Sequence, residues 1–429
     1  MEKSKIHVLV FPAEGSNAIE LHDALSSCVN IKLYGASSVE RHGKYIFKNY
    51  IGNAPNIFAT DFISQFNRII KENSIDVIFP THDTVALKLA EHEKDITCRI
   101  IQGDLKTAQI CRSKILTHTL FSDCSFIPKR IDITQIHKED FPLFAKPDEG
   151  QGAVGAQKIS NIEELKGKDY NNFLVTEFLP GLEYTVDCFT DKDKNLRYIA
   201  PRTRERLMAG ISVAGQTLQL TNEIQQIAET INDRLHFLGL WYFQLKKDRT
   251  GKLKLLEIST RCAGTMCLTR ARGINLPLLS VYTALGYDIS IMENSYHVKM
   301  DRALIGRYDI DYFYKTVYID FDDTITLNNQ VNLNSIRFLY QCKNQNKEII
   351  LLTKHAAEIE KTLESYAISK SLFNKIISIK ENDSKSSHII PQDAIFIDNA
   401  YKERYEVSTK LHIPVFDVDG IEFLLDWKY

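Results

Sequence analysis

Short apolar runs alternate with stretches of helical periodicity over the first hundred residues. Residues 5–11, 30–37 and 75–83 have the pattern of strands, and the intervening segments 14–27 and 60–73 have the pattern of helices. This alternation predicts a parallel sheet with helices on its faces.

Ligands of a parallel sheet gather at the carboxyl ends of its strands. These ends fall here at residues 15–17, 35–38 and 80–83. We expect Ser16 or Asn17 to cap the helix that follows the first strand.

The pattern changes along the rest of the chain. Strands joined by short turns, with a few helices, run from about residue 114 to 300, and a second strand–helix alternation starts at residue 315. At about 150 residues per domain, 429 residues allow roughly three units. We expect an α/β and α+β multidomain protein with a Rossmann-like subdomain at 1–110, a second domain at 111–305 and a third at 313–429.

A glycine-rich segment follows the expected strand that ends at Lys146. Gly150, Gly152 and Gly155 form the pattern G-x-G-x-x-G, but residues 156–160 after it have a strand pattern. A dinucleotide fingerprint needs a helix there, so that interpretation fails. Between antiparallel strands such a loop can close over phosphates, because glycines let backbone N–H groups approach the oxygens. The nearby lysine favours this hypothesis over a glycine-rich hairpin without a ligand.

Polar residues at two-residue spacing mark an expected hairpin at 241–261. Gln244 is on its first strand, and Glu257 and Ser259 on its second strand point to the same face. Oxygen ligands on one face fit magnesium bound jointly by protein and phosphates. Arg261 continues the alternation and can meet a developing negative charge. The alternative is a solvated polar strand face.

Two further acids flank a turn at 180–181. Glu177 precedes the turn and Glu183 follows it. An acid followed by backbone polar groups suits the edge of adenine, and a second carboxylate suits ribose hydroxyls. An ordinary hairpin is the alternative.

In this order the motifs resemble the ATP-grasp superfamily, especially its branch akin to carbamoyl-phosphate synthetase and biotin carboxylase. The resemblance covers about residues 1–300 and implies a small β-rich lid at about 114–175 over a central ATP-grasp subdomain. It also implies ATP and magnesium, or manganese, as cofactors. The matching segments are 112–114, 146–147 with the 150–155 loop, 177–183, Gln244 and 257–261.

The resemblance implies a role for each matched residue. Lys114, Lys146 and the loop glycines would contact phosphates, Glu177 and Leu179 would flank adenine, Glu183 would hold ribose, Gln244 and Glu257 would bind magnesium, and Arg261 would steady an acyl phosphate. Ser259 stands where many members have asparagine, and its hydroxyl is a shorter and poorer ligand for a second magnesium.

The usual reaction of this family converts a carboxylate and ATP into an acyl phosphate, which an amine or other nucleophile attacks. Alternation in 201–206 predicts Arg202, Arg204 and Arg206 on one strand face, where they would bind an anionic substrate. A solvated strand edge is the alternative. His82 and Asp83 are further candidates for substrate binding.

A second group of reactive residues begins where the apolar strand 315–319 ends. Asp320 at that position can attack phosphorus, and Asp322 can protonate the leaving oxygen and later activate water. Thr353 ends a later apolar strand and can donate a hydrogen bond to phosphate. Asp398 ends another strand. Between them, Lys380 or Lys385 can pair with an aspartyl-phosphate, and we favour Lys385.

Residues 313–429 resemble the haloacid dehalogenase-like phosphatases. The resemblance implies a Rossmann-like domain with Asp320 as nucleophile and magnesium near Asp320, Asp322 and Asp398. The 33 residues from Asp320 to Thr353 fit one helix and one strand, so we expect no cap domain there.

Composition restricts the partners. The net charge of −2 argues against a general electrostatic grip on nucleic acid or anionic membranes. There is no apolar run of the roughly 18 residues that span a bilayer, and no export signal is recognised. The eight cysteines are scattered without a C-x-x-C pair, so we expect reduced thiols and a cytoplasmic protein. A homodimer is compatible with these data.

The sequence therefore predicts a bifunctional enzyme: an ATP-dependent carboxylate–amine (or related) ligase joined to a magnesium-dependent phosphatase. Its substrates would be a small carboxylate with an amine, or a phosphorylated metabolite. Two alternatives stay open: an ATP-grasp kinase for a small molecule joined to the phosphatase, and a nucleotide-binding scaffold with one silent domain.

Overall fold

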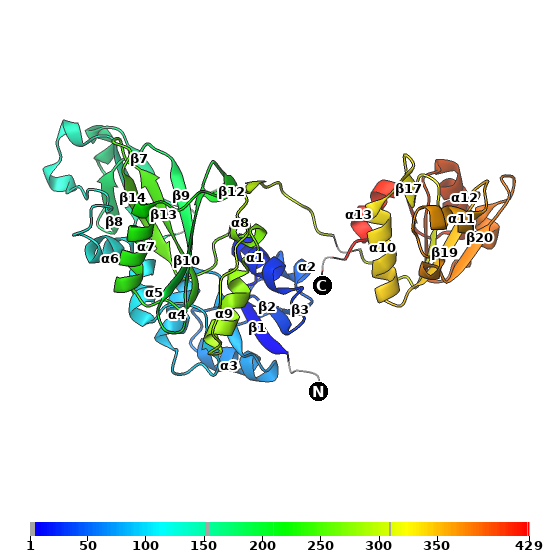
Figure 1. Ribbon diagram of the computed structural model, residues 1–429, viewed down its shortest axis with the longest axis horizontal. Helices are drawn as coiled ribbons and strands as arrows, with labels where there is room; N and C mark the ends of the chain where they lie inside the picture. The colour runs from blue at the N-terminus through cyan, green and yellow to red at the C-terminus, as the bar shows by residue number, and fades with distance from the viewer. Residues whose placement is uncertain (1–4, 151–153, 209, 309, 427, 429) are drawn as a thin grey trace. The chain divides into compact units, whose positions relative to one another are not determined.

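The chain folds into two compact units, residues 1–304 and 305–428 (Figure 1). The structure, a computed structural model, describes residues 5–150, 154–208, 210–308, 310–426 and 428. No helix within these stretches combines the length and the apolar character needed to cross a bilayer. The eight cysteines, all of which lie in these stretches, form no disulfide. The expected subdivision at residues 110–111 stays a prediction.

A five-stranded parallel sheet opens the first unit, as the alternation of strands and helices predicts. Its order is β3-β2-β1-β4-β5. Successive residues of the central strand face opposite sides: Val10 packs in one core and Phe11 in another, against Phe62 and Phe66. The strands are β1 (Ile6–Phe11), β2 (Ile31–Ala36), β3 (Asn49–Ile51), β4 (Val77–Pro80) and β5 (Arg99–Ile100).

Helices cover both faces of this sheet. They are α1 (Gly15–Leu25), α2 (Gly43–Ile46), α3 (Phe62–Glu72), α4 (Asp83–Glu91) and α5 (Leu105–Arg112). The predicted cap of α1 is wrong: the N-cap residue is Glu14, and its side chain makes no capping hydrogen bond. The carboxylate of Glu14 instead lies 3.5 Å from the hydroxyl of Tyr50.

Three antiparallel sheets follow. A small sheet, ordered β7-β6-β8, carries the glycine-rich loop between its first two strands along the chain, and a larger central sheet has the order β10-β9-β13-β14. The strands of these two sheets are β6 (Leu143–Pro147), β7 (Gln157–Ile159), β8 (Phe173–Glu177), β9 (Glu183–Thr190), β10 (Leu196–Thr203), β13 (Gly239–Lys247) and β14 (Leu253–Ser259). The third sheet contains β11 (Arg206–Met208), β12 (Ile211–Gln216) and β15 (Lys299–Asp301).

The two faces of the central sheet differ in character. Trp241 and Phe243 of β13 pack with Val186 of β9 and Ile227 of α7 in one apolar core. Because side chains alternate along a strand, Gln244 and its even-numbered neighbours face the opposite side. The helices of this region are α6 (Lys114–Leu120), α7 (Asn222–Arg234), α8 (Cys267–Ala271) and α9 (Leu276–Ala284).

The second unit is built on a parallel sheet ordered β20-β19-β16-β21-β22. Its central strand β16 (Thr316–Ile319) ends directly before Asp320. A short hairpin, one helix and one strand fill the interval to Thr353, so the expected helix and strand are present. The other elements are β17 (Thr326–Leu327), β18 (Gln330–Val331), α10 (Leu333–Asn344), β19 (Glu348–Thr353), α11 (Ile359–Ser365), β20 (Lys375–Ser378), β21 (Ala394–Ile397), α12 (Tyr401–Leu411), β22 (Val415–Phe416) and α13 (Ile421–Leu424).

Candidate functional site

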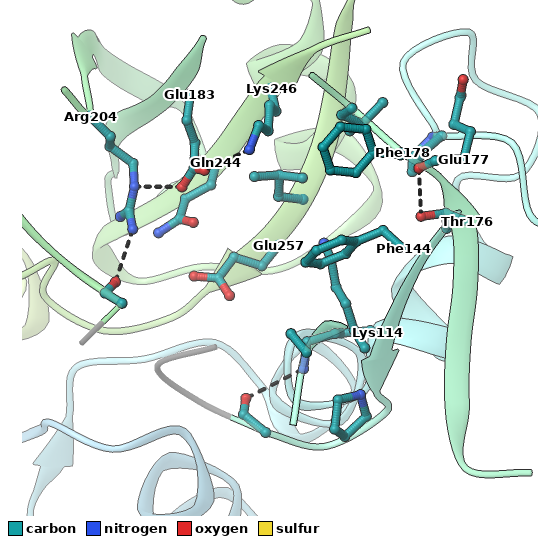
Figure 2. A pocket seen from close by; sticks show the side chains of 18 of the residues that line it. Lys114, Phe144, Thr176, Glu177, Phe178, Glu183, Arg204, Gln244, Lys246 and Glu257 are labelled. Carbon is teal, nitrogen blue, oxygen red and sulfur yellow. Dashed lines mark hydrogen bonds and ion pairs between the residues drawn. The ribbon is translucent and has the colours of Figure 1, made fainter. Parts of the chain in front are cut away.

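One cavity of about 300 Å³ in the first unit collects most of the residues that sequence analysis selects. The small sheet and the central sheet supply opposite walls (Figure 2). The sequence-predicted residues that line it are Lys114, Lys146, Gly150, Glu177, Leu179, Glu183, Arg204, Gln244 and Glu257. Gly152 lies outside the described residues. Their roles stay predictions, but their convergence on one cavity is a structural fact.

Gln244 and Glu257 lie directly opposite each other on β13 and β14. Side chains of directly opposite residues share a face and stand about 5 Å apart at Cβ. Figure 2 shows both pointing into the cavity from the central sheet. Two oxygen-bearing side chains are therefore presented side by side at its polar end.

These two residues fit a magnesium ion. An amide oxygen and a carboxylate are hard oxygen donors, and magnesium in nucleotide sites usually takes one or two carboxylates together with phosphate oxygens. No three His, Cys, Asp or Glu side chains converge as a metal cage in the described stretches. The pair therefore suits a magnesium ion that takes most of its other ligands from the phosphate oxygens of a nucleotide.

Two lysines border the polar end. The Nζ of Lys114 donates to the carbonyl oxygens of Asp148 and Gly150, at 3.1 and 3.4 Å, so it contacts the glycine-rich loop directly. Burial lowers the pKa of Lys146 to about 8; Glu257 opposes this shift and Lys114 adds to it. An anionic ligand would stabilise both ammonium groups.

This perturbed pKa predicts pH-dependent nucleotide binding. Phosphates bind the charged form of Lys146, so the complex takes up a proton wherever the empty protein has lost it. We expect the affinity for the ATP analogue AMP-PNP with magnesium to fall roughly tenfold from about pH 7 to about pH 9. Calorimetry in two buffers of different ionisation enthalpy measures the affinity and the proton uptake.

The Lys146→Met variant should bind more weakly and lose this pH dependence. The exposed Lys94→Met is the matched control and should behave like the wild type. A flat affinity in the wild type over this range would contradict the assignment.

The opposite end of the cavity is apolar. Phe144, Phe178 and Leu179 contribute to it, which suits a planar base. The carboxylate of Glu177 accepts a hydrogen bond from the Lys129 backbone N–H at 2.8 Å, and Figure 2 shows its side chain turned away from the polar end. Any contact of residue 177 with adenine would therefore come from its backbone.

Glu183 is already paired. Its carboxylate lies 2.7 Å from Nε of Arg204 and 3.5 Å from Nζ of Lys246 (Figure 2). Lys246 is a residue that sequence analysis missed, although its two-residue spacing from Gln244 on β13 was a usable signal. A ribose at this position would add to an existing network.

The structure does not bring Ser259 to the cavity that Gln244 and Glu257 line, and its metal role stays a prediction. Its hydroxyl donates to the Asp83 carboxylate at 2.8 Å, and the residue does not line the cavity. Arg261 grips the same carboxylate with two hydrogen bonds, Nε to Oδ1 at 3.0 Å and Nη2 to Oδ2 at 3.1 Å. Asp83 is thus engaged by both residues and lines no described cavity, contrary to its predicted role in substrate binding.

This cluster joins the start of α4 to the end of β14. Burial would raise the pKa of Asp83, but the Arg261 charge and hydrogen bonds outweigh burial and hold it below its usual value. We expect Asp83→Asn to lower the free energy of unfolding by about 3 kcal/mol, because it leaves a buried guanidinium without its anion.

Urea denaturation measures this loss. The matched control is Asp95→Asn, which removes an exposed carboxylate paired with His92 and should change stability by less than about 0.5 kcal/mol. Equal losses in the two variants would contradict the buried-pair interpretation.

Two other substrate-binding predictions need correction. His82 is the exposed N-cap of α4, where its Nδ1 accepts from the Thr84 N–H, and it lines no described cavity. The three arginines do not share a strand face. Arg202 is the penultimate residue of β10 and is buried, Arg204 follows that strand, and Arg206 belongs to β11 and pairs with Asp301 at the surface.

Arg202 and Arg204 do meet in a second cavity of about 110 Å³ beside the polar end. Gln244 and Glu257 line both cavities. Arg261 also lines the smaller one. The arrangement provides space for a small second substrate next to the pair that fits magnesium.

Asp148 anchors the glycine-rich loop and was not recognised from the sequence. Its carboxylate accepts from the Ser113 hydroxyl at 2.7 Å and from the Ile115 N–H at 2.8 Å. It therefore ties the start of the loop to the first turn of α6, which carries Lys114.

The second unit collects its predicted residues at the carboxyl ends of its central strands. Nζ of Lys385 lies 2.7 Å from Asp320 and 2.6 Å from Asp398, and all three side chains are buried. Burial lowers the pKa of Lys385, but the two carboxylates more than offset this and raise it overall. Burial also raises the pKa of Asp320, against the effect of the lysine. Thr353, fully buried, ends the neighbouring strand β19.

The predicted magnesium site at Asp320, Asp322 and Asp398 is not assembled. Within the described stretches these carboxylates do not form a metal-binding group. The reason is that Lys385 lies between two of them, while Asp322 faces His355, whose Nδ1 is 2.9 Å away. Sequence analysis missed this histidine, which is two residues after Thr353.

Comparison with known proteins supports part of the first unit. Residues 169–304 match a family described as "ATP-grasp in the biosynthetic pathway with Ter operon". A D-alanine–D-alanine ligase of Azobacteroides pseudotrichonymphae is 27% identical over 175 residues, which are 35% of this chain and 52% of that protein. The chain thus spans about half the length of this curated relative.

Two solved structures share the fold. The biotin carboxylase domain of the Hydrogenobacter thermophilus 2-oxoglutarate carboxylase, in complex with MgADP, aligns with a TM-score of 0.54 at 17% identity over 68% of this chain and 72% of that one. An L-amino acid ligase from Bacillus licheniformis aligns with a TM-score of 0.53 at 14% identity, over 67% of this chain and 75% of that one. ATP-grasp ligases use ATP and magnesium. Residues 169–304 therefore match an ATP-grasp family, and the first unit as a whole shares the fold of these two enzymes.

Proposed function

We propose that the first unit is an ATP-dependent ligase that joins a small carboxylate to an amine or a related nucleophile. The observation that carries this proposal is the convergence of Lys114, Lys146, Gln244 and Glu257 on one cavity with an apolar end. ATP would place its base against Phe144 and its phosphates at the polar end. The fold and its ligase relatives support this choice of reaction.

The residues of the chain suit such a transfer. A carboxylate oxygen attacks the γ-phosphorus, the bond from phosphorus to the β,γ-bridging oxygen breaks, and ADP leaves. Lys114 and Lys146 hold the phosphates and offset their charge, and Arg261 stands beside the acyl phosphate. Gln244 and Glu257 would hold magnesium, which when bound neutralises charge on the phosphates.

The second half of the reaction occurs at the acyl carbon. The amine nitrogen attacks this carbon and then loses a proton. The bond between the carbon and the phosphate oxygen breaks, and phosphate leaves. Positioning of the two substrates provides most of the catalysis in reactions of this kind. The 110 Å³ cavity lies beside the phosphate end, where the second substrate has to be.

Product analysis tests this proposal. Carboxylic acids crossed with amines are screened with ATP and magnesium, and ADP and phosphate are measured. ADP release that needs both partners supports a ligase. Release that needs one partner, with a stable phosphorylated product, indicates a kinase, and no release with retained AMP-PNP binding indicates a scaffold.

For the second unit we propose a phosphatase that acts through an aspartyl-phosphate. The observation that favours it is Lys385 held between Asp320 and Asp398 beside Thr353, at the end of the central strands. Asp320 would attack phosphorus while Asp322 protonates the leaving oxygen. Water would then release phosphate and give its proton to Asp322.

The full chain should hydrolyse p-nitrophenyl phosphate if this proposal is right. A survey of divalent ions in the same assay tests whether a metal is needed, because the carboxylates as placed do not form a metal site. No hydrolysis under any of these conditions would contradict the phosphatase proposal and leave the ligase proposal unaffected.

A further inference from the structure

Four residues form a row across the central sheet. Arg202 of β10 is paired with Thr185 of β9, Thr185 with Gln244 of β13, and Gln244 with Glu257 of β14. Directly opposite residues present their side chains on one face. All four line the 110 Å³ cavity.

The row gives this cavity two ends. Neighbouring strands lie about 4.8 Å apart, so the backbones of Arg202 and Glu257 are separated by about 14 Å. Glu257 and Gln244, which fit magnesium and phosphates, mark one end. Arg202 marks the other end, and its guanidinium reaches inward from the opposite edge of the sheet.

Polar atoms at the Arg202 end lack partners. This side chain is 2% exposed, and its Nε donates to the Thr265 hydroxyl at 3.0 Å while Nη1 pairs with Asp187. Its Nη2 and the hydroxyl of Thr185 have no hydrogen-bond partner anywhere in the described part of the chain. Because buried polar groups are almost always hydrogen-bonded, this pair of donors indicates a ligand.

The first turn of α1 forms the facing wall. Ser16 and Asn17 line the same cavity, and the side chain of Glu14 does not cap the helix. The first N–H groups of an 11-residue helix favour an anion. A Cβ on Gly264 would lie 2.5 Å from the Ser16 hydroxyl oxygen, so a larger residue in the loop after β14 would displace this hydroxyl from the cavity wall.

We propose that this end of the cavity is a subsite for a carboxylate that does not react, bound by Arg202, Thr185 and the N-terminus of α1. The inference rests on the ligase proposed above and narrows its substrate. One substrate is a compact molecule with its reacting carboxylate or amine near Glu257 and a second, anionic carboxylate at the other end. The cavity of about 110 Å³ is well below the 300–1,000 Å³ usual for drug-sized ligands, which favours a compact substrate.

Matched pairs of small molecules test the subsite. Calorimetry on the full chain saturated with magnesium and AMP-PNP compares butanoate with succinate, and propylamine with β-alanine. Each pair differs by a carboxylate in place of a methyl group. We expect the member with the additional carboxylate to bind at least about tenfold more tightly in one pair, the scale of one charge-assisted hydrogen bond. Equal responses in both pairs, including no binding by any member, would overturn the subsite.

Two variants locate the effect. Thr185→Val removes a donor without changing shape, and the double variant Arg202→Gln with Asp187→Asn removes the guanidinium while keeping the buried pair neutral. Each should reduce the preference for the additional carboxylate to less than about threefold. A preference that persists in both variants places the anion elsewhere and overturns the assignment.

Nucleotide binding by the wild-type chain distinguishes a failure of the subsite proposal from a failure of the ligase proposal on which it rests. A wild-type chain that does not bind AMP-PNP with magnesium contradicts the ligase itself. A chain that binds the nucleotide but shows no preference contradicts only the subsite.

Discussion

Replacing Glu257 with glutamine is expected to lower substrate-dependent ADP release by at least about a hundredfold. Three acids line the 300 Å³ cavity, but Glu177 accepts from a backbone N–H and Glu183 pairs with Arg204. Glu257 is the acid that points into the cavity beside Gln244 (Figure 2). Glutamine keeps its size and removes its charge, so the loss would come from electrostatics.

Calorimetry separates this effect from unfolding. The wild type should bind AMP-PNP more tightly with magnesium than without it, and Glu257→Gln should lose that difference while still binding the nucleotide. Glu205→Gln, at an exposed position between β10 and β11, is the matched control and should behave like the wild type. An unchanged response to magnesium in the Glu257 variant would remove this residue from the proposed ion site.

Local spacing and the order of the motifs selected the residues that meet at the 300 Å³ cavity. Gln244 and Glu257 were selected because two strands joined by the turn at 248–251 must pair. The register next to the turn would place Gln244 opposite Leu256, and an irregularity between Gln244 and Leu245 places it opposite Glu257 instead. The glycine pattern around Gly150 gave the correct loop because the residues after it have strand periodicity. The hairpin and the glycine-rich loop are both formed by residues close together in the sequence, and such local structure is what periodicity predicts.

Contacts between distant segments could not be read in the same way. Asp83 and Arg261 are 178 residues apart, and their pairing depends on how the first sheet docks against the end of β14. Asp83 at the end of a parallel strand therefore looked like a ligand-binding residue, and Ser259 like a metal ligand. In the structure the Ser259 hydroxyl instead donates a hydrogen bond to the Asp83 carboxylate.

The arginine prediction failed at a strand boundary. Two-residue periodicity assumes that the strand continues, but β10 ends at Thr203 and the chain enters a different sheet at Arg206. Asp322 shows the same limit in the second unit: its contact with His355 spans 33 residues and depends on the loop after β19. The positions of site residues at strand ends and in loops with long-range contacts could therefore not be predicted from the sequence.

Replacing Asp320 with asparagine is expected to abolish hydrolysis of p-nitrophenyl phosphate, with a loss of at least about 10⁴-fold. Asparagine has nearly the same shape but cannot act as the attacking carboxylate. It also removes one of the two anions that hold Lys385, while Asp398 remains 2.6 Å from that lysine. The lysine therefore keeps a charged partner, which limits the damage to the fold.

The adjacent Asp323→Asn is the matched control for this variant. Asp323 is exposed and has a φ of 51°, a left-handed backbone conformation that asparagine tolerates well. The control should therefore keep wild-type hydrolysis and stability. Equal activity in the two variants would exclude Asp320 as the nucleophile, whereas loss only in Asp320→Asn, with normal urea denaturation, locates phosphoryl transfer at the end of β16. Trapping of a radiolabelled aspartyl-phosphate in the wild type alone would add direct evidence, because it reports the covalent bond itself.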